Sequence, residues 1–193
     1  MKLIVNEIFY SLQGEGGRSG EASIFIRLTK CNLSCSFCDT EFLSGNEMTI
    51  EEILQAIKPF ACKWIIWTGG EPTIQLTNNH LLKFKEAGYK QAIETNGTRE
   101  VPSLIDYISC SPKTNYEKVK DIISEVDEIR LPVKYGDRLP DIMILPKAKK
   151  YFLSPVFDGD KINRDNINYC VEQIKLHPQW SLSLQVHKLI NIE

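Results

Sequence analysis

The 193-residue sequence predicts an α/β fold, an incomplete (β/α) barrel of about six strands in a single domain covering residues 1–193. Two observations predict this fold. Short runs rich in β-branched and aromatic residues alternate with amphipathic segments, which is typical of a parallel sheet with right-handed crossovers. The chain has about six such strand-helix units, fewer than the eight of a closed barrel. Its length fits one domain, and it contains no fixed-period repeat, low-complexity tract or linker.

The first half of the chain begins with two predicted strands separated by a polar loop. That loop, residues 11–20, contains too many glycines to form a helix. Thr49 and Glu52 then form a capping box, which predicts an amphipathic helix running to Pro59. Gly88 is a typical residue for ending the helix after it. The predicted strands of this half are residues 2–10, 23–29, 62–68 and 89–95, and its predicted helices are residues 50–59 and 77–87.

The second half continues the alternation. Its predicted helices are residues 102–106, 116–123 and 163–176, and its predicted strands are residues 107–111, 128–133, 151–154 and 182–187. In parallel α/β folds, ligands bind at the carboxyl ends of the strands. Most of the polar and glycine-rich stretches of the chain follow directly after predicted strands. We therefore expect one face of the molecule to contain most of the functional chemistry.

The composition favours a small-molecule ligand. Lys and Arg total 23 and Asp and Glu total 25, for a net charge of −2, and the only basic cluster is Lys147, Lys149 and Lys150. This balance argues against a nucleic-acid partner. Six cysteines are too few for a disulfide scaffold, and the N-terminus does not resemble a signal peptide. Apolar runs such as residues 64–67 are too short to cross a membrane. The sequence thus predicts a cytoplasmic protein with reduced thiols.

The most informative stretch is the cysteine loop, which contains Cys31, Cys35 and Cys38. At this spacing, one short loop can turn three thiols toward one centre, which indicates a metal site. Three ligands are one fewer than structural zinc requires, although folding can add a distant one. An iron-sulfur cluster held by three thiolates, with one iron open to a small molecule, is the reading we favour. Three cysteines without a shared role are the third option. The distant residues able to complete a zinc site are His80, His177, His187, Cys62, Cys110 and Cys170.

The cysteine loop, together with Gly69-Gly70-Glu71-Pro72 after the following strand, resembles the radical S-adenosylmethionine (radical SAM) superfamily. This resemblance implies that the three cysteines hold a [4Fe-4S] cluster. It also implies that the amino and carboxylate groups of S-adenosylmethionine bind the fourth iron. The reduced cluster would then cleave S-adenosylmethionine to a 5′-deoxyadenosyl radical, which abstracts a hydrogen atom from the substrate.

A narrower resemblance extends over almost the whole chain, to the 7-carboxy-7-deazaguanine synthase family. It rests on residues 7–16, Arg27, residues 38–40, 68–72, 111–113 and 185–188. Membership would imply conversion of 6-carboxy-5,6,7,8-tetrahydropterin to 7-carboxy-7-deazaguanine, with loss of ammonia, in 7-deazapurine and queuosine biosynthesis. It would also imply a Mg²⁺ requirement, a homodimer and an electron donor such as flavodoxin. Some members have a longer insertion between the first two cysteines, whereas this chain keeps the short spacing.

The resemblance also assigns residues to ligands. The expected S-adenosylmethionine contacts are Phe37, Cys38, Asp39, Gly70, Glu94, Asn96, Ser111, Pro112 and Lys113. The expected substrate contacts are Leu12, Gln13, Gly14, Glu15, Arg27, Thr68, His187 and Glu193. His187 is also the one side chain with a possible catalytic role, and Thr40 is the expected Mg²⁺ ligand.

Elementary chemistry supports some of these assignments. A pterin edge offers N–H donors and a carbonyl acceptor, which a carboxylate, an amide and free backbone groups match. Arg27 lies in an otherwise apolar strand and needs an anionic partner, either the substrate carboxylate or a structural salt bridge. Thr40 alone would bind Mg²⁺ weakly and would need substrate oxygens to complete the ligand set. Its alternative role is a loop threonine bonded to nearby backbone.

Two other functions fit parts of the sequence. A glycyl-radical-enzyme activating enzyme shares the cysteine spacing and a glycine-containing loop near the N-terminus, but it would need a broad surface for a protein substrate. A zinc-binding interaction module would be colourless and would not bind S-adenosylmethionine.

Overall fold

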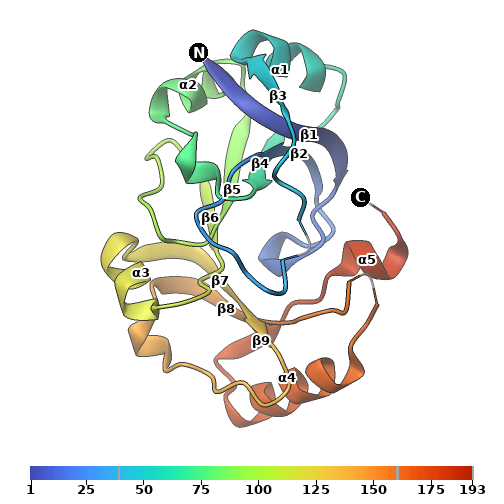
Figure 1. The fold of residues 1–193 in the computed structure, drawn as a ribbon, viewed down its shortest axis with the longest axis vertical. Coiled ribbons are helices and arrows are strands. Elements are labelled where there is room, and N and C mark those ends of the chain that lie inside the picture. Colours follow the sequence, from blue (N-terminus) through green and yellow to red (C-terminus); the bar gives the residue numbers. More distant parts are fainter. Residues whose placement is uncertain (39, 160, 193) are drawn as a thin grey trace.

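The computed structural model of the chain describes residues 1–38, 40–159 and 161–192. One nine-stranded sheet runs through this described part, in the order β3-β1-β2-β4-β5-β6-β7-β8-β9 (Figure 1). The strands are β1 (Lys2–Leu12), β2 (Ala22–Leu28), β3 (Asn46–Thr49), β4 (Trp64–Gly69), β5 (Lys90–Thr95), β6 (Tyr107–Cys110), β7 (Glu125–Val133), β8 (Lys147–Pro155) and β9 (Trp180–Leu182).

The sheet is an open barrel, as predicted. From β2 to β9 all neighbouring strands are parallel, whereas β1 pairs antiparallel with both β2 and β3. Because β3 and β9 are its two edges, the sheet does not close. It has nine strands, more than the predicted six or so. The sequence nevertheless predicts eight strand segments along the chain, and of the strands in the described residues only β3, which is four residues long, has no predicted counterpart.

Helices cover the outer face of the sheet. They are α1 (Ile50–Ile57), α2 (Asn78–Glu86), α3 (Tyr116–Ile122) and α4 (Arg164–Leu176), whereas the short C-terminal α5 (Val186–Ile190) lies against the loop after β1. The predicted capping box is present: Thr49 Oγ1 accepts from the Glu52 amide, and the Glu52 carboxylate accepts from the Thr49 amide at 2.7 Å. The two hydrogen bonds satisfy backbone N–H groups at the start of the helix that have no partner within it, so α1 begins where the sequence predicts.

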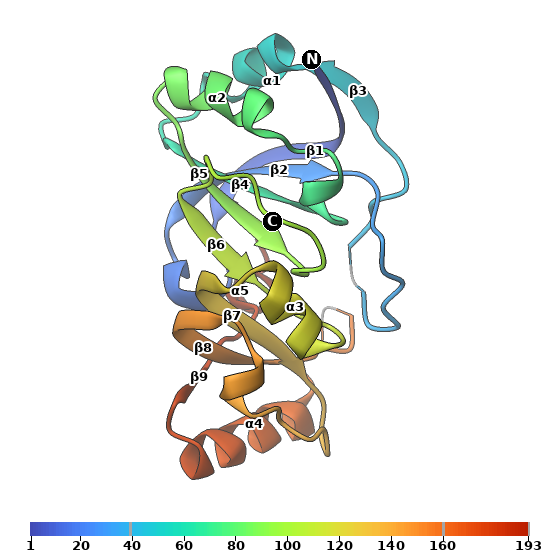
Figure 2. The same ribbon diagram turned by 90° about the vertical axis from the view of Figure 1, so that its left-hand side faces the viewer.

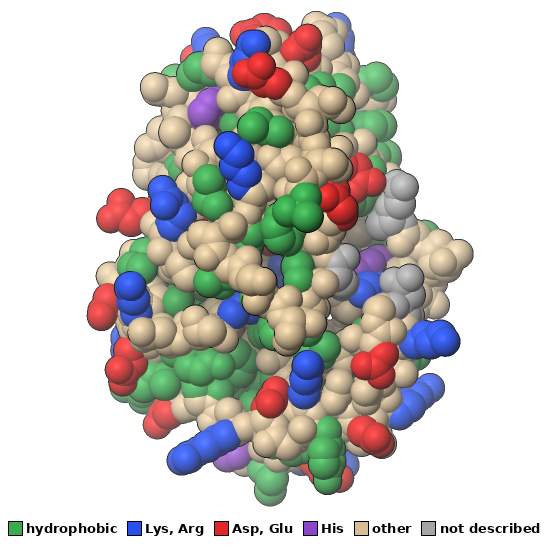
Figure 3. Space-filling view, in the orientation of Figure 1, with side chains coloured by type: hydrophobic (Ala, Val, Ile, Leu, Met, Phe, Trp, Pro, Cys, Tyr) green, Lys and Arg blue, Asp and Glu red, His purple; other side chains and the backbone are tan. Residues whose placement is uncertain are grey.

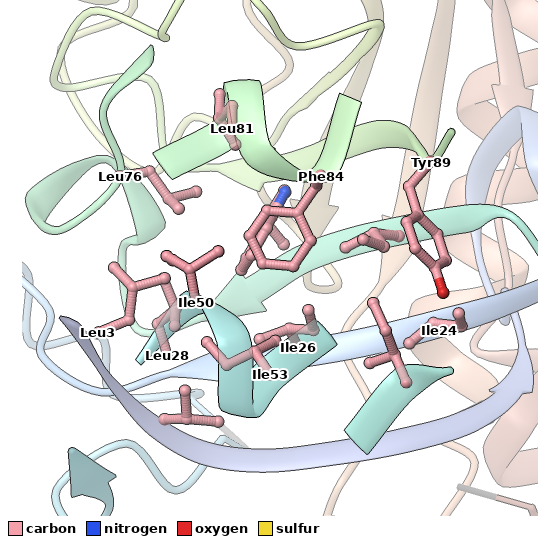
Figure 4. Packing of buried hydrophobic residues seen from close by; sticks show 14 of the residues in the cluster. Leu3, Ile24, Ile26, Leu28, Ile50, Ile53, Leu76, Leu81, Phe84 and Tyr89 are labelled. Carbon is pink, nitrogen blue, oxygen red and sulfur yellow. The ribbon is translucent and has the colours of Figure 1, made fainter. Parts of the chain in front are cut away.

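Two apolar clusters join the helices to the outer face. In the first, side chains of α1 and α2 such as Ile53 and Phe84 pack on Ile26 and Trp67 of the strands (Figure 4). In the second, α3 and α4 pack on β7 and β8. The inner face has a smaller apolar layer, Phe9, Phe25, Ile66 and Ala92. Further toward the carboxyl ends, the inner face is lined by polar side chains, and these form the candidate site.

Two sequence predictions of secondary structure are wrong. Residues 102–106 form a turn instead of a helix, because Asp106 is drawn to β5 by hydrogen bonds to the backbone of Gln91. The predicted last strand, residues 182–187, ends at Leu182. The chain then turns inward, the Val186 amide donates to the Gly14 carbonyl at 2.9 Å, and His187 lies on α5. Contact with the first loop thus outweighs the strand-like alternation of this segment.

Two features of the whole molecule bear on its partners. No helix in the described ranges is both long and apolar enough to cross a membrane. On the face shown in Figure 3, acidic and basic side chains are interspersed.

Candidate active site

A cavity of about 230 Å³ lies at the carboxyl ends of the parallel strands. The segment between β2 and β3, which contains the cysteine loop, runs along this edge of the sheet (Figure 2). Of the residues assigned from sequence, those that line the cavity are Glu15, Cys31, Cys35, Phe37, Cys38, Thr40, Thr68, Gly70, Glu94, Asn96, Ser111 and Lys113. The structure therefore brings together residues from the cysteine loop and from β1, β4, β5 and β6.

The two glycines after β4 allow the cysteine loop to lie against the end of that strand. Gly69 has a φ of +122°, and a Cβ added there would overlap the Leu28 carbonyl. A Cβ on Gly70 would lie 2.5 Å from the Lys30 carbonyl carbon and 3.0 Å from Cys31 Cβ. No side chain fits in either place, because nonbonded carbon atoms normally stay about 3.5–4.0 Å apart. Gly69 thus allows close contact with the end of β2, and Gly70 sets the position of the first cysteine.

The cysteine loop fits a cluster better than a single metal ion. All three of its thiols line the cavity, and within the described ranges no three His, Cys, Asp or Glu side chains are placed to hold one ion. A zinc ion needs its ligands around one point, whereas each thiolate of an iron-sulfur cluster binds a different iron. The thiol set, facing one cavity from one loop, suits a [4Fe-4S] cluster.

Lys113 supplies positive charge beside the thiols. Its ammonium donates to Ser111 Oγ at 2.6 Å and lies 5.7 Å from the Phe37 ring centre. Burial raises the pKa of the Cys35 thiol, and Lys113 partly offsets this effect. Burial likewise lowers the pKa of Lys113. A half-buried cation at this point is suited to an anionic or thiolate-bound group.

Glu71 of the Gly-Gly-Glu-Pro turn has a structural role. It is fully buried and accepts hydrogen bonds from Thr73, from Thr95 Oγ1 at 2.8 Å and from the Asn96 amide at 2.7 Å. These bonds fasten the end of β4 to the end of β5. Asn96 in turn donates to Asn32 in the cysteine loop at 3.1 Å. The motif thus links three loops around the cavity.

Arg130 of β7 is the centre of a polar network on the inner face. Its Nη2 donates to Glu94 Oε1 at 2.6 Å, and its Nη1 lies 3.3 Å from Glu15 Oε2. Glu94 also accepts from Thr68 Oγ1 at 2.8 Å and from Gln13 Nε2 at 3.2 Å. Burial alone would raise the pKa of Glu94, but Arg130 and these hydrogen bonds together outweigh it and lower the pKa. The carboxylate is therefore ionised at neutral pH.

Several assigned residues lie outside the cavity lining. Leu12 is partly exposed, and Gln13 is buried behind Glu94. Pro112 is buried. Gly14 packs against His187, whose ring occupies the place of a Gly14 side chain. Arg27 pairs with Glu7 at 3.0 Å. The roles assigned to these residues stay predictions, and Asp39 and Glu193 lie outside the described residues.

The sequence interpretation missed parts of the site. Arg130 lines the cavity, as do Gln185 and the end of β8 with the residues after it, 154–157. Glu128, two residues before Arg130, is also part of the network. A signal existed for this pair, because two opposite charges spaced by two along a strand share one face of a sheet. No comparable signal marked residues 154–157.

Comparisons with known proteins agree with this geometry. The model of the radical SAM superfamily matches residues 25–143. The chain is 42% identical over 188 residues to the 7-carboxy-7-deazaguanine synthase of Bacteroides thetaiotaomicron, with 97% of each chain covered. It is also 42% identical to that of Haemophilus influenzae, covering 97% of this chain and 92% of the relative.

A solved structure agrees as well. The crystal structure of QueE from Escherichia coli matches with a TM-score of 0.73 and 25% identity, covering 97% of this chain and 95% of that one. The match covers the open barrel from end to end. Together with the cysteine loop at the cavity, these likenesses show that the chain belongs to the radical SAM superfamily and, within it, to the family of 7-carboxy-7-deazaguanine synthases.

Proposed function

We propose that this protein is a 7-carboxy-7-deazaguanine synthase. It converts 6-carboxy-5,6,7,8-tetrahydropterin to 7-carboxy-7-deazaguanine and ammonia, in the pathway to 7-deazapurines and queuosine. The observation that carries the proposal is the full-length likeness to synthases of this name, joined to a cavity that contains both the cysteine loop and a polar network. Cavities of this kind, with a few convergent polar groups, are typical of small-molecule sites.

In this proposal the cavity has a cofactor side and a substrate side. Cys31, Cys35 and Cys38 hold a [4Fe-4S] cluster, and Gly70, which lines the same cavity, contacts S-adenosylmethionine next to it. When bound, these groups supply the radical that removes a hydrogen atom from the substrate. The protein's own contribution is to position the substrate and exclude water. Ser111 and Lys113 border the cofactor side.

The substrate side is the network of Glu15, Thr68 and Glu94. The resemblance assigns Glu94 to S-adenosylmethionine, but we propose it for the substrate because it bonds to Thr68 and shares Arg130 with Glu15. Ionised carboxylates accept hydrogen bonds only, so they match the N–H donors of a pterin edge. Gln13 buttresses Glu94 from behind, and His187 packs on Gly14 at the end of the same loop. We further propose that Arg27 exchanges Glu7 for the substrate carboxylate on binding.

Thr40 lines the cavity within the same loop as the cysteines, and we propose it as a Mg²⁺ ligand that acts with substrate oxygens. A single neutral hydroxyl binds this ion too weakly to hold it alone. The proposal therefore includes an order of binding, in which Mg²⁺ becomes tightly held only in the presence of the substrate.

The remaining parts of the proposal concern the whole protein. We propose a single domain, since one sheet includes strands from both ends of the chain. We also propose a cytoplasmic homodimer that receives electrons from a partner such as flavodoxin. The alternative function, an activating enzyme for a glycyl-radical enzyme, is not favoured, because the named relatives that match the whole chain are synthases.

One anaerobic assay tests the function. Reconstituted protein is incubated with dithionite, Mg²⁺, S-adenosylmethionine and 6-carboxy-5,6,7,8-tetrahydropterin, and the product is identified by mass. We expect 7-carboxy-7-deazaguanine. Cleavage of S-adenosylmethionine without a deazapurine product would reject the substrate while keeping the superfamily chemistry, and the activating enzyme would then be tested next.

A further inference from the structure

We propose that Arg130 is a positioning residue for this reaction. Its buried guanidinium holds the carboxylates of Glu15 and Glu94 in the orientation that the substrate requires, and its charge keeps Glu94 a hydrogen-bond acceptor. This inference rests on the proposed function and deepens it, because it adds to the substrate side a residue that the sequence interpretation did not include.

One guanidinium, that of Arg130, contacts two carboxylates. Glu15 lies in the loop after β1 and Glu94 lies near the end of β5, so the two carboxylates come from segments far apart in the chain. Arg130 Nη1 lies 3.3 Å from Glu15 Oε2, and Nη2 donates to Glu94 Oε1 at 2.6 Å. The side chain of Arg130 is only 7% exposed. Because a guanidinium donates in fixed, coplanar directions, the two carboxylates are held relative to each other.

The third nitrogen of Arg130 is anchored behind the cavity. Its Nε donates to Ser109 Oγ at 2.7 Å, and Ser109 donates to Glu128 Oε1 at 2.8 Å. Glu128 also accepts from the Gly17 amide at 2.7 Å and from the Tyr107 hydroxyl at 2.9 Å. Glu128 is only 2% exposed and is saturated with donors. It therefore serves as the fixed support of Arg130, whereas Glu15 and Glu94 line the cavity.

The charges explain why the site needs this cation. Three carboxylates, those of Glu15, Glu94 and Glu128, face Arg130. Lys113 adds a second positive charge that acts on Arg130 and Glu15. Without Arg130, burial would favour protonation of Glu94. A protonated carboxyl would present a donor where the substrate's N–H group needs an acceptor.

The test compares Arg130→Lys and Arg130→Met with a matched control, Lys149→Gln. Lys149 also pairs with a carboxylate, Asp127 at 2.6 Å, but its side chain is 73% exposed and lies outside the cavity lining. Arg130→Lys keeps the buried charge and loses the two-armed geometry. We expect it to fold, to bind S-adenosylmethionine within twofold of wild type, and to raise the KM for the tetrahydropterin at least tenfold. Lys149→Gln should leave both values unchanged.

A pH profile separates positioning from simple support of the fold. In Arg130→Met, which removes the charge, the acidic limb of kcat/KM should move to higher pH, since Glu94 would then hold its proton more tightly. A wild-type KM in Arg130→Lys, or an unmoved acidic limb in Arg130→Met, would overturn the proposal. So would an equal loss of substrate binding, cofactor binding and melting temperature, because that pattern is expected of a purely structural residue.

A second measurement does not depend on the reaction. Protein labelled with ¹³C at the glutamate carboxyl carbons is titrated by NMR, with Glu15→Gln and Glu94→Gln used to assign the two signals. We expect the carboxyl pKa of Glu94 to rise in Arg130→Met, because the guanidinium charge then no longer offsets the effect of burial. Unchanged titration of Glu94 in this variant would overturn the role of Arg130. A wild-type protein that makes no 7-carboxy-7-deazaguanine would instead reject the proposed function, and the titration would still decide what Arg130 does.

Discussion

Gly70→Ala tests whether the turn after β4 sets the position of the cysteine loop. An added Cβ would lie 2.5 Å from the Lys30 carbonyl carbon, whereas such atoms normally stay about 3.5–4.0 Å apart. The backbone before Cys31 must therefore move by roughly 1 Å, because the obstructing atoms are main chain and cannot rotate away. Overpacking of this kind costs about 1–3 kcal/mol. For a chain of this size, that corresponds to a fall in Tm of roughly 2–12 °C.

Gly88→Ala is the matched control. Gly88 has a φ of +82°, and no atom lies within 4 Å of an added Cβ. Alanine at this position is destabilising by about 1–2 kcal/mol because of its backbone conformation alone. The expected falls in Tm for Gly70→Ala and Gly88→Ala are therefore similar. Their iron content should separate them. After anaerobic reconstitution, Gly88→Ala should contain as much iron and sulfide per chain as wild type, and Gly70→Ala much less. Full iron content and wild-type Tm in Gly70→Ala would refute the argument.

Three other outcomes follow from the same structure. Replacing any one of the three loop cysteines with Ala should abolish the intact cluster, measured as iron and sulfide per chain. The control Cys62→Ala should keep the cluster. Full activity in a loop mutant would contradict the three-thiolate assignment. Glu71→Gln should lower the free energy of unfolding, measured by urea denaturation, by about 1–3 kcal/mol, because it leaves buried donors unpaired. The control Glu51→Gln, at an exposed position of α1, should stay within about 0.5 kcal/mol of wild type. The pKa of Glu94 is lower in the folded protein than in the unfolded chain. Ionised Glu94 should therefore stabilise the fold fully above its unfolded pKa of about 4.3, and this contribution to the free energy of unfolding should disappear as the pH falls through the folded pKa. If wild type stays more stable than Glu94→Gln at low pH, this reasoning is wrong.

Local signals predicted the parts of the fold that local chemistry determines. The capping box at Thr49 placed the start of α1 because its two hydrogen bonds join residues three apart. The four residues of β3 lack such a signal, because they form a strand only by pairing with β1. The end of the chain shows the same limit. Residues 182–187 alternate like a strand, yet the Val186 amide bonds to Gly14, a partner that no local pattern indicates.

The same distinction applies to the site. The cysteines and glycines were recognisable because their chemistry requires those residue types at a fixed spacing in one loop. Arg130 on β7 was not, because its partners come from the loop after β1 and from β5, which lie far apart in the chain and are not neighbours of β7 in the sheet. A charge within an apolar strand shows that a partner exists, without showing which one.

The polar network also explains why the resemblance extends to both ends of the chain. Gly16 of the first loop donates to Ser183 Oγ at 2.8 Å, and Glu15 accepts from Gln185 at 3.2 Å. The first loop therefore lies between Arg130 on one side and the C-terminal segment on the other. A change in either neighbour would move Glu15 with respect to the cysteine loop across the cavity. Because radical chemistry depends on the distance between the cofactor and the substrate, the ends of the chain are expected to matter for the reaction as much as the cysteine loop itself.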